Sequence, residues 1–394
     1  MPTARLGLAT CAVNGNIYAI GGYPAATVHG IGTVEMYDPA TDAWTTKSPM
    51  PTERRWLVCG VVGGTIYAIG GFPTDGEPAL NTVESYDVAS DTWTTRAPML
   101  TPRKAPAATV VDGKIYVMGG ANADEDIVAS VEMYDPATDS WSARAPMAGA
   151  RAMLASGTVD GKIYAIGGPG PGVQGYNTVE EYDPELDSWV AKTAMPTGRW
   201  GVSATAVNGI IYAIGGANGF TALSTVEAYD PATDTWTEKR SIGSVDEPGD
   251  GARWAFGIAT VDEKVYVIGG ALRPAMPPHP GTTRVQEYTP PTVATGVETP
   301  SKELADNQGT GLGQNFPNPF LRFTNLRFRL DKAQHVRLVV HDVLGRPLQV
   351  LVDAWLEAGP HAAVFTPGNL PSGMYVYTLE TTGRRIDGRM QLTK

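Results

Sequence analysis

Short runs of alternating apolar and polar residues recur along the first three quarters of the chain with a nearly fixed period. Each Ile-Tyr or Val-Tyr run ends at a Gly-Gly pair, at residues 21/22, 70/71, 119/120, 167/168, 215/216 and 269/270, spaced 49, 49, 48, 48 and 54 residues apart. In the first five repeats a Val-Glu-x-Tyr-Asp segment follows, and an Asp-x-Trp segment comes after it. Alternation with period two between turn residues predicts β-strands and not helices.

Each repeat holds about four such strands, which is the content of one blade of a β-propeller. One blade cannot bury both of its faces, so we expect six blades to pack radially and close a ring over residues 1–289. The glycine pairs should adopt positive φ where backbones approach closely, and the repeated Tyr and Trp should fill the space between neighbouring blades.

This succession of Gly-Gly, Tyr and Trp resembles the kelch repeat, and the resemblance covers residues 1 to about 289. It implies a propeller that serves protein or glycan recognition in most members and catalysis in a minority.

A second pattern begins after the repeats. Residues 290–314 are rich in Thr, Gly, Pro and charged residues and predict a linker. Short alternating segments at 326–330, 336–340 and 374–379 predict a small immunoglobulin-like β-sandwich over residues 315–394.

Five short motifs of this tail carry a second resemblance. They are Asn315-Phe316-Pro317-Asn318-Pro319-Phe320, the segment 341–346 with Gly345 and Arg346, the segment 358–361, the segment 370–375 with Gly373 and Tyr375, and the closing segment 390–394. They resemble the type A C-terminal sorting domain of type IX secretion cargo, although His341 stands where that family usually has an aromatic residue. The resemblance implies that the type IX machinery is a partner and that the protein is secreted or held on the outer cell surface of a bacterium.

Charge and composition narrow the function classes. The 394-residue chain has a net charge of −11, although the tail from Asn315 onward carries 10 basic against 6 acidic residues. An acidic propeller argues against nucleic-acid binding, and no apolar run approaches the roughly 20 residues of a membrane span. The two cysteines, Cys11 and Cys59, occupy corresponding positions of the first two repeats and form either buried thiols or a disulfide.

The propeller sequence offers little for catalysis. Its two histidines, His29 and His279, fall in expected loops, so we predict no metal site, no cofactor and no nucleophile–histidine pair. We therefore interpret the chain as a secreted or surface recognition module that binds a protein or a glycan at the mouth of the propeller channel. An extracellular sugar-modifying enzyme, similar to an epimerase or mutarotase, is the alternative, and a purely architectural surface protein is a third.

An arginine lies 16 residues before the first glycine of every pair, namely Arg5, Arg54, Arg103, Arg151, Arg199 and Arg253. These arginines either form a ring that faces a ligand at the channel mouth or belong to the repeat itself, each tied to a carboxylate of the Val-Glu segment. In blade six that position is Gln286, so Arg253 is the one expected to be freer to bind.

The residues just after the arginine differ between repeats, and variation within a repeat is where specificity is expected. They include Arg55, Trp56, Lys104, Trp200 and Trp254, near the loop aromatics Tyr23, Phe72 and Phe220. These tryptophans form either an aromatic platform for a ligand or ordinary packing between blades. The candidate ligand-binding residues are Arg54, Arg55, Trp56, Arg103, Lys104, Arg199, Trp200, Arg253 and Trp254.

Residues 1–5 align with 50–54 and with the later Met-to-Arg segments, each of which follows a Trp-bearing strand. Blade six has no Asp-x-Trp segment after Tyr288. We therefore expect a truncated N-terminus, with a signal peptide and one outer strand encoded before Met1, and a blade six of three strands.

Overall fold

The computed structural model describes residues 1–24, 27, 29–169, 175–242, 251–271, 282–290, 310–313, 324–343, 345–367 and 370–392. The chain divides into two compact units, Met1–Pro290 and Pro291–Lys394. The described residues form β-strands, turns and loops, with no helix. Among them there is accordingly no helix long and apolar enough to span a membrane.

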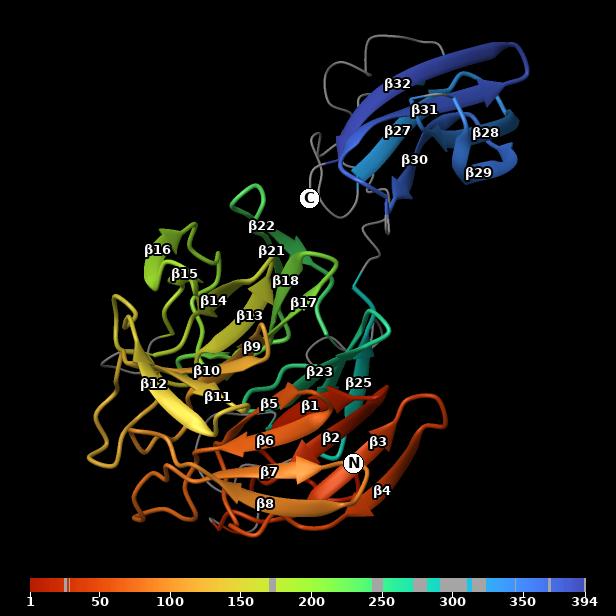
Figure 1. The fold of residues 1–394 in the computed structure, drawn as a ribbon. Helices are drawn as coiled ribbons and strands as arrows, with labels where there is room; N and C mark the ends of the chain where they lie inside the picture. The colour runs from red at the N-terminus through yellow and green to blue at the C-terminus, as the bar shows by residue number, and fades with distance from the viewer. Residues whose placement is uncertain are drawn as a thin grey trace. The chain divides into compact units, whose positions relative to one another are not determined.

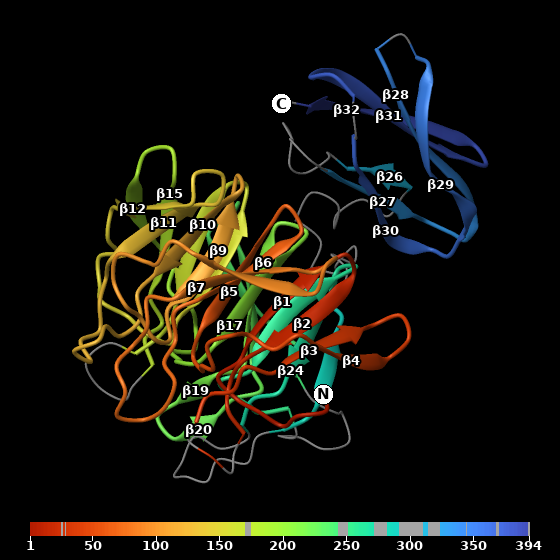
Figure 2. The same ribbon diagram turned by 60° about the horizontal axis from the view of Figure 1, so that its bottom comes forward.

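Unit 1 is built from a repeated antiparallel sheet, which we call a blade (Figures 1 and 2). Blade one is β1 (Ala9–Val13), β2 (Asn16–Ile20), β3 (Val34–Asp38) and β4 (Ala43–Lys47). Blade two is β5 (Val58–Val62), β6 (Thr65–Ile69), β7 (Val83–Asp87) and β8 (Thr92–Arg96). Blade three is β9 (Ala107–Val111), β10 (Lys114–Met118), β11 (Val131–Asp135) and β12 (Ser140–Arg144).

The later blades repeat this order with two differences. Blade four is β13 (Ala155–Val159), β14 (Lys162–Ile166), β15 (Val179–Asp183) and β16 (Ser188–Lys192). Blade five is β17 (Ser203–Val207), β18 (Ile210–Ile214), β21 (Val226–Asp230) and β22 (Thr235–Lys239), with a separate hairpin of β19 (Ala217–Asn218) and β20 (Thr221–Ala222). Blade six has three strands among the described residues, β23 (Gly257–Val261), β24 (Lys264–Ile268) and β25 (Val285–Tyr288).

The first strands of the blades lie side by side around a common centre. β1 lies against β5, β5 against β9, β9 against β13, β13 against β17 and β17 against β23, and β23 returns to β1. Figure 1 shows the last strands, such as β4, β8 and β12, at the periphery. Unit 1 is therefore a β-propeller, the fold that the repeat predicts.

One buried arginine holds the inner end of each blade together. In blade one the Arg5 guanidinium donates to the carbonyls of Ala19 at 2.9 Å, Gly21 at 3.1 Å and Thr33 at 2.7 Å, and pairs with the Glu35 carboxylate at 3.0 Å. Burial lowers the pKa of Arg5 to about 10, against the opposing effect of Glu35. The guanidinium thus joins β2, the glycine pair and β3 within one blade.

The same pairing recurs around the ring. Its members are Arg54–Glu84, Arg103–Glu132, Arg151–Glu180 and Arg199–Glu227. In blade six, Arg253 instead donates to the neutral Gln286 side chain and to the Gly269 carbonyl. These six arginine side chains are among the largest fully buried groups of the molecule.

The backbone carbonyl of each arginine also joins its blade to the preceding one. It accepts a hydrogen bond from the second glycine of the pair before it: Gly22 to Arg54, Gly71 to Arg103, Gly120 to Arg151, Gly168 to Arg199, Gly216 to Arg253 and Gly270 to Arg5, at 2.8 to 3.1 Å. Gly21 and Gly22 have φ of 62° and 87°, and a Cβ on Gly21 would lie 2.6 Å from the Arg54 carbonyl oxygen. The prediction that the glycine pairs permit close backbone contact is confirmed.

The repeated aromatic residues lie between blades, as predicted. Tyr86 packs at a tilt against Trp93 of its own blade, with ring centroids 5.0 Å apart, and meets Tyr18 of blade one edge-on at 6.0 Å. The Trp93 indole N–H donates to the Ser48 carbonyl of blade one at 3.0 Å. Each hydrophobic cluster of the propeller therefore contains residues of adjacent blades, for example Ile20 and Tyr86.

Unit 2 is a two-sheet sandwich. One sheet contains β26 (Gly311–Leu312), β27 (Thr324–Leu330) and β30 (Gly359–Phe365), and the other contains β28 (Gln334–His341), β29 (Pro347–Leu356), β31 (Gly373–Thr381) and β32 (Arg384–Leu392). Leu326 and Phe365 from the first sheet pack against Leu338 and Leu379 from the second. The predicted linker, 290–314, extends too far toward the C-terminus, because β26 falls inside it and pairs with β27.

Replacing Arg103 with alanine should leave the Glu132 carboxylate buried without its charged partner. We expect the free energy of unfolding of the propeller to fall by about 3–5 kcal/mol, measured by urea denaturation with tryptophan fluorescence. The double variant Arg103→Met/Glu132→Leu, which removes both charges, should recover part of the loss. Equal losses in the single and double variants would contradict the assignment of the loss to the unpaired Glu132 carboxylate.

Candidate functional site

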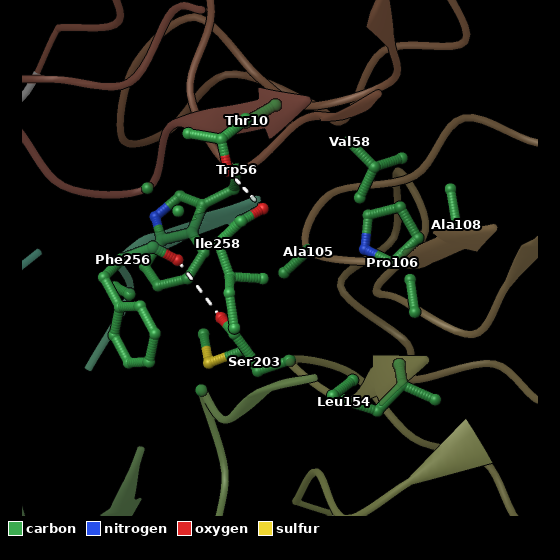
Figure 3. Close-up of a pocket in the computed structure, with 18 of the residues that line it drawn as sticks. Thr10, Trp56, Val58, Ala105, Pro106, Ala108, Leu154, Ser203, Phe256 and Ile258 are labelled. Atoms are coloured by element: carbon green, nitrogen blue, oxygen red, sulfur yellow. Dashed lines mark hydrogen bonds between the residues drawn. The ribbon is translucent and has the colours of Figure 1, made fainter. Parts of the chain in front are cut away.

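A cavity of about 180 Å³ opens at the centre of the propeller, and every blade contributes to it (Figure 3). Each blade contributes one run of four residues to the cavity wall, and each run begins two positions after the buried arginine of that blade. The six runs are 7–10, 56–59, 105–108, 153–156, 201–204 and 255–258. Figure 3 shows Thr10, Val58, Pro106, Leu154, Ser203 and Ile258 around it. We call this space the mouth cavity.

A ring of backbone hydrogen bonds surrounds the mouth cavity. The residue two positions after each arginine has φ between 45° and 61°, and these residues are Gly7, Trp56, Ala105, Met153, Gly201 and Ala255. Five inter-blade bonds of 2.7 to 2.9 Å join them: Trp56 N to Gly7 O, Ala105 N to Trp56 O, Met153 N to Ala105 O, Gly201 N to Met153 O and Gly7 N to Ala255 O. The sequence analysis missed this ring. The one sequence signal for it was that Gly7 and Gly201 occupy the same position of their repeats, since glycine adopts positive φ readily. The tryptophan and methionine at this position in other repeats gave no such signal, because they seldom adopt positive φ.

Three tryptophans from blades two, five and six meet beside the cavity, and we call them the indole cluster. The Trp56 and Trp254 rings lie 5.8 Å apart, and Trp200 meets Trp254 edge-on at 4.9 Å. Trp254 is buried, whereas Trp56 and Trp200 are half-buried. A Cβ on Gly7 would lie 3.3 Å from the Trp56 indole, so this glycine gives the indole its space over blade one.

A second group, which we call the cation stack, covers blades one to three. The Arg55 guanidinium lies 4.2 Å from the Tyr23 ring centre and 4.5 Å from that of Phe72, and the Lys104 ammonium lies 4.7 Å from Phe72. Burial raises the pKa of Tyr23, although Arg55 opposes the shift. Cations over aromatic faces are favourable contacts, so these four side chains support one another.

Two carboxylates in the following loops neutralise the cation stack. Arg55 pairs with Asp75 and Lys104 pairs with Glu125, and both carboxylates are exposed to solvent. Arg55 itself is almost fully buried. The side chains of the stack are therefore held in place before any ligand arrives.

Four of the predicted ligand-binding residues do not reach the mouth surface. Arg54, Arg103, Arg199 and Arg253 each have 0 % exposure, because their guanidinium groups are enclosed in the contacts within the blade described above. The interpretation of these arginines as part of the repeat is therefore correct, and the prediction that they face a ligand is wrong. The expectation that Arg253 is freer to bind also fails, since Gln286 accepts its hydrogen bond in place of a carboxylate.

The hydroxyl groups of the cavity wall bond to neighbouring blades. Thr10 donates to the Ile258 carbonyl at 2.8 Å, Ser156 to Ala108 at 3.0 Å and Ser203 to Phe256 at 3.2 Å. Of the cavity-lining residues in the described part of the chain, Cys59 carries the one titratable side chain. The side chains of the wall are thus mostly apolar, and its hydroxyl protons are already donated.

The two cysteines are free thiols, as the first of the two interpretations predicts. Cys11 is buried between blades one and two, and Cys59 is half-buried at the cavity wall. The hydrogen bond with Cys59, together with burial, raises the pKa of Cys11 well above its ordinary value.

The comparison with protein families gives a match over most of unit 1. The model of the KLHDC2/KLHL20/DRC7 Kelch-repeats domain matches residues 1–168 and 59–270. The chain belongs to the kelch-repeat family. Among solved structures, "Structure of YjhT" superposes with a TM-score of 0.62 at 18 % sequence identity, covering 73 % of this chain and 96 % of that one. The comparison with curated protein sequences gives no match.

The tail motifs lie outside the kelch propeller, in unit 2. Gly345, with φ of 79°, and Arg346 form a tight turn after β28, in which the Arg346 guanidinium donates to the Asp342 carboxylate at 2.6 Å. Gly373 begins β31, and Tyr375 is buried, with its hydroxyl donating to the Pro371 carbonyl at 2.6 Å. The motif at Asn315 to Phe320 lies outside the described residues.

Trp56 covers part of the cavity in which Cys59 is the reactive group. Replacing Trp56 with glycine removes the indole and also suits the positive φ at this position, so the kelch fold should remain stable. We expect a thiol reagent to modify Cys59 several-fold faster in this variant, as measured by mass spectrometry of the labelled peptides. Cys11 should stay unlabelled in both proteins, and an unchanged Cys59 rate would show that the indole does not limit access.

Proposed function

We propose that this kelch protein is a recognition module that binds a polypeptide partner at the mouth of its propeller. The observation that carries the proposal is the indole cluster, which presents two half-buried tryptophans beside a cavity lined mostly by apolar side chains. Clustered aromatic side chains in partly desolvated positions are typical of the residues that dominate protein binding.

An exposed aromatic residue extends this surface. Phe220 lies at the turn of the β19–β20 hairpin with 70 % of its surface exposed. The hairpin is attached to the indole cluster, because Trp200 N donates to Ala217 O at 2.9 Å. A large apolar side chain kept in solvent beside a partly open aromatic cluster supports docking of an apolar partner segment.

The polar groups of the mouth favour a polypeptide over a glycan. Sugar recognition combines aromatic stacking with hydrogen bonds to many hydroxyl groups, but the hydroxyls of the cavity wall already donate to backbone carbonyls. The cations of the stack are paired with Asp75 and Glu125, so an acidic glycan would have to displace these carboxylates. An apolar side chain of a peptide can bind without breaking the hydroxyl hydrogen bonds and without displacing these carboxylates.

A sugar-modifying enzyme is the weaker candidate. Proton transfer at a sugar carbon requires an acid and a base within reach of the reacting atoms. Among the described residues, those that line the cavity include Cys59 and no carboxylate or imidazole. The lining supports binding better than catalysis.

The tail supports export of the module through the type IX pathway. Its motif blocks resemble a sorting domain, and it forms a compact unit of its own that follows the propeller in the chain. We propose that unit 2 directs the kelch propeller across the outer membrane of its bacterium and that the propeller then acts outside the cell.

Peptide-display selection on the full chain should yield binders that depend on the mouth. Trp200→Ala and Phe220→Ala should each weaken the selected peptides by about 1–3 kcal/mol, which is about 5- to 150-fold in Kd, because both side chains act as anchors. Titration calorimetry or fluorescence anisotropy measures the change.

Leu186→Ala is the matched control. Leu186 is 73 % exposed and lies in the turn after β15, at the opposite end of its blade from the mouth. The peptides should bind this variant normally. Binders that are indifferent to Trp200 and Phe220, or a glycan array that gives ligands where peptide selection gives none, would contradict the proposal.

Export can be tested separately with the full chain behind an added signal peptide. In a bacterium with a working type IX system the protein should reach the medium or the cell surface, and a variant lacking residues 315–394 should accumulate in the periplasm. Strains without the machinery should retain both forms, as measured by immunoblotting of fractions. Release of the shortened variant to the outside would refute a sorting role for the tail.

A further inference from the structure

The first strands of neighbouring blades meet along contacts that we call seams, and short side chains bond across some of them. Between blades three and four the Thr109 and Thr158 hydroxyl oxygens lie 2.7 Å apart. Between blades five and six the Thr205 and Thr260 hydroxyl oxygens lie 2.8 Å apart. In each pair one residue comes from each first strand. The first strands therefore approach closely enough for side chains with one atom beyond Cβ to touch across a seam.

The seam between blades one and two holds two thiols instead. Cys11 lies on β1 and Cys59 on β5, and these two strands pack side by side. Both residues belong to one hydrophobic cluster, and a hydrogen bond joins their side chains. The chain has two cysteines in 394 residues, so all of its thiols meet at this one seam.

Hydroxyl residues occupy the equivalent positions in other blades. Cys11 lies six positions after the buried arginine of its blade, where blades three and five have Thr109 and Thr205. Cys59 lies five positions after its arginine, where blade four has Ser156, whose hydroxyl donates across a seam. The fold thus accepts a hydroxyl at either position. What the two thiols add is the capacity to form a covalent bond with each other.

The two thiols differ in access and in acidity. Cys59 is half-buried and lines the mouth cavity, whereas Cys11 is buried and lies outside the cavity lining. The hydrogen bond with Cys59, together with burial, raises the pKa of Cys11 well above its ordinary value. A reagent that enters the cavity therefore meets Cys59 first, while Cys11 stays protonated beside it.

We propose that Cys59 and Cys11 form a redox-active thiol pair that reacts with low-molecular-weight disulfides and closes a disulfide bond between blades one and two. Cys59 is the entry thiol, because it faces the cavity. Cys11 is the resolving thiol, because it contacts Cys59 from the neighbouring strand. The reaction needs no polypeptide partner, so it can be tested without one.

The reaction has two exchange steps. The Cys59 thiolate attacks one sulfur of the reagent disulfide, forms a mixed disulfide and releases one reagent thiolate. Cys11 then gives its proton to solvent, and its thiolate attacks the Cys59 sulfur and releases the second reagent thiolate. The two cysteines lose two electrons, the reagent disulfide gains them, and the protons of the two cysteines end on the two reagent thiols. Excess external thiol reverses both steps.

The bond forms at the seam that carries part of the indole cluster. Trp56 N donates to Gly7 O at 2.7 Å across this seam, and β1 and β5 follow these two residues in their blades. Closing the disulfide makes the seam covalent and removes the free thiol from the cavity wall. The redox state of the surroundings thus changes both the reactivity of the cavity and the attachment of blade two to blade one.

The test treats the folded full chain with bis(2-hydroxyethyl) disulfide under native conditions. The products are identified by mass spectrometry of the intact protein and of its tryptic peptides. The native sequence should lose two hydrogen atoms and retain no reagent, and peptide 6–47 should be joined to peptide 56–96. Dithiothreitol should restore both thiols.

Cys11→Thr and Cys59→Ser are the matched variants, because other blades carry these residues at the equivalent positions. Cys11→Thr should retain one reagent group on Cys59, since no second thiol displaces it. Cys59→Ser should react about 10-fold more slowly than the native chain or slower still, because the buried Cys11 lies outside the cavity lining.

A native chain that keeps the reagent on Cys59, as Cys11→Thr is expected to do, would show that the two sulfur atoms do not close and would overturn the proposal. Reaction of Cys59→Ser at the native rate would also overturn it, because the reagent would then reach Cys11 without the cavity thiol. So would a native chain that stays unmodified when folded and reacts only after unfolding in urea.

Discussion

The buried arginine of each blade is the constraint on which the rest of the propeller depends. Its guanidinium joins the ends of the inner strands to a side-chain oxygen of the same blade, which is a glutamate carboxylate in blades one to five and the Gln286 amide in blade six. Its backbone carbonyl accepts a hydrogen bond from the glycine N–H of the preceding blade. One residue therefore fixes both the shape of a blade and its distance from the neighbour. Because a buried charge is costly unless polar groups surround it, the arrangement tolerates little displacement, and the arginine contacts repeat around the ring.

This rigidity leaves the next two positions free to vary. The residues one and two places after the arginine are Leu6 and Gly7 in blade one, Arg55 and Trp56 in blade two, and Trp200 and Gly201 in blade five. Their backbones are held by bonds to the loop after the glycine pair and to the adjacent blade, and these bonds do not require a particular side chain. The mouth can thus change its chemistry from blade to blade while the core of the propeller stays the same.

Periodicity made the propeller, the glycine contacts and the inter-blade aromatics predictable, because each depends on residues that every repeat supplies. The same periodicity also suggested that the arginines form a ligand-binding ring, and this prediction is wrong. A residue that is present in all six repeats fits a shared structural role better. The carboxylates that neutralise Arg55 and Lys104 lie in the loops after the glycine pairs, which have no common pattern, so the cation stack could not be derived in advance. The contact between Trp56 and Trp254 spans blades two and six over a glycine of blade one, and it depends on a positive φ that tryptophan rarely adopts.

Blade two connects the two chemical halves of the mouth. Arg55 lies among Tyr23 and Phe72 in the cation stack, whereas the next residue, Trp56, lies against Trp254 in the indole cluster. Adjacent residues can serve both groups because the left-handed backbone at Trp56 turns its side chain away from the direction of a regular strand. A partner that contacts both halves therefore interacts with two consecutive residues fixed by one buried arginine, Arg54. The stability of that arginine's contacts sets how precisely the two halves are placed relative to each other.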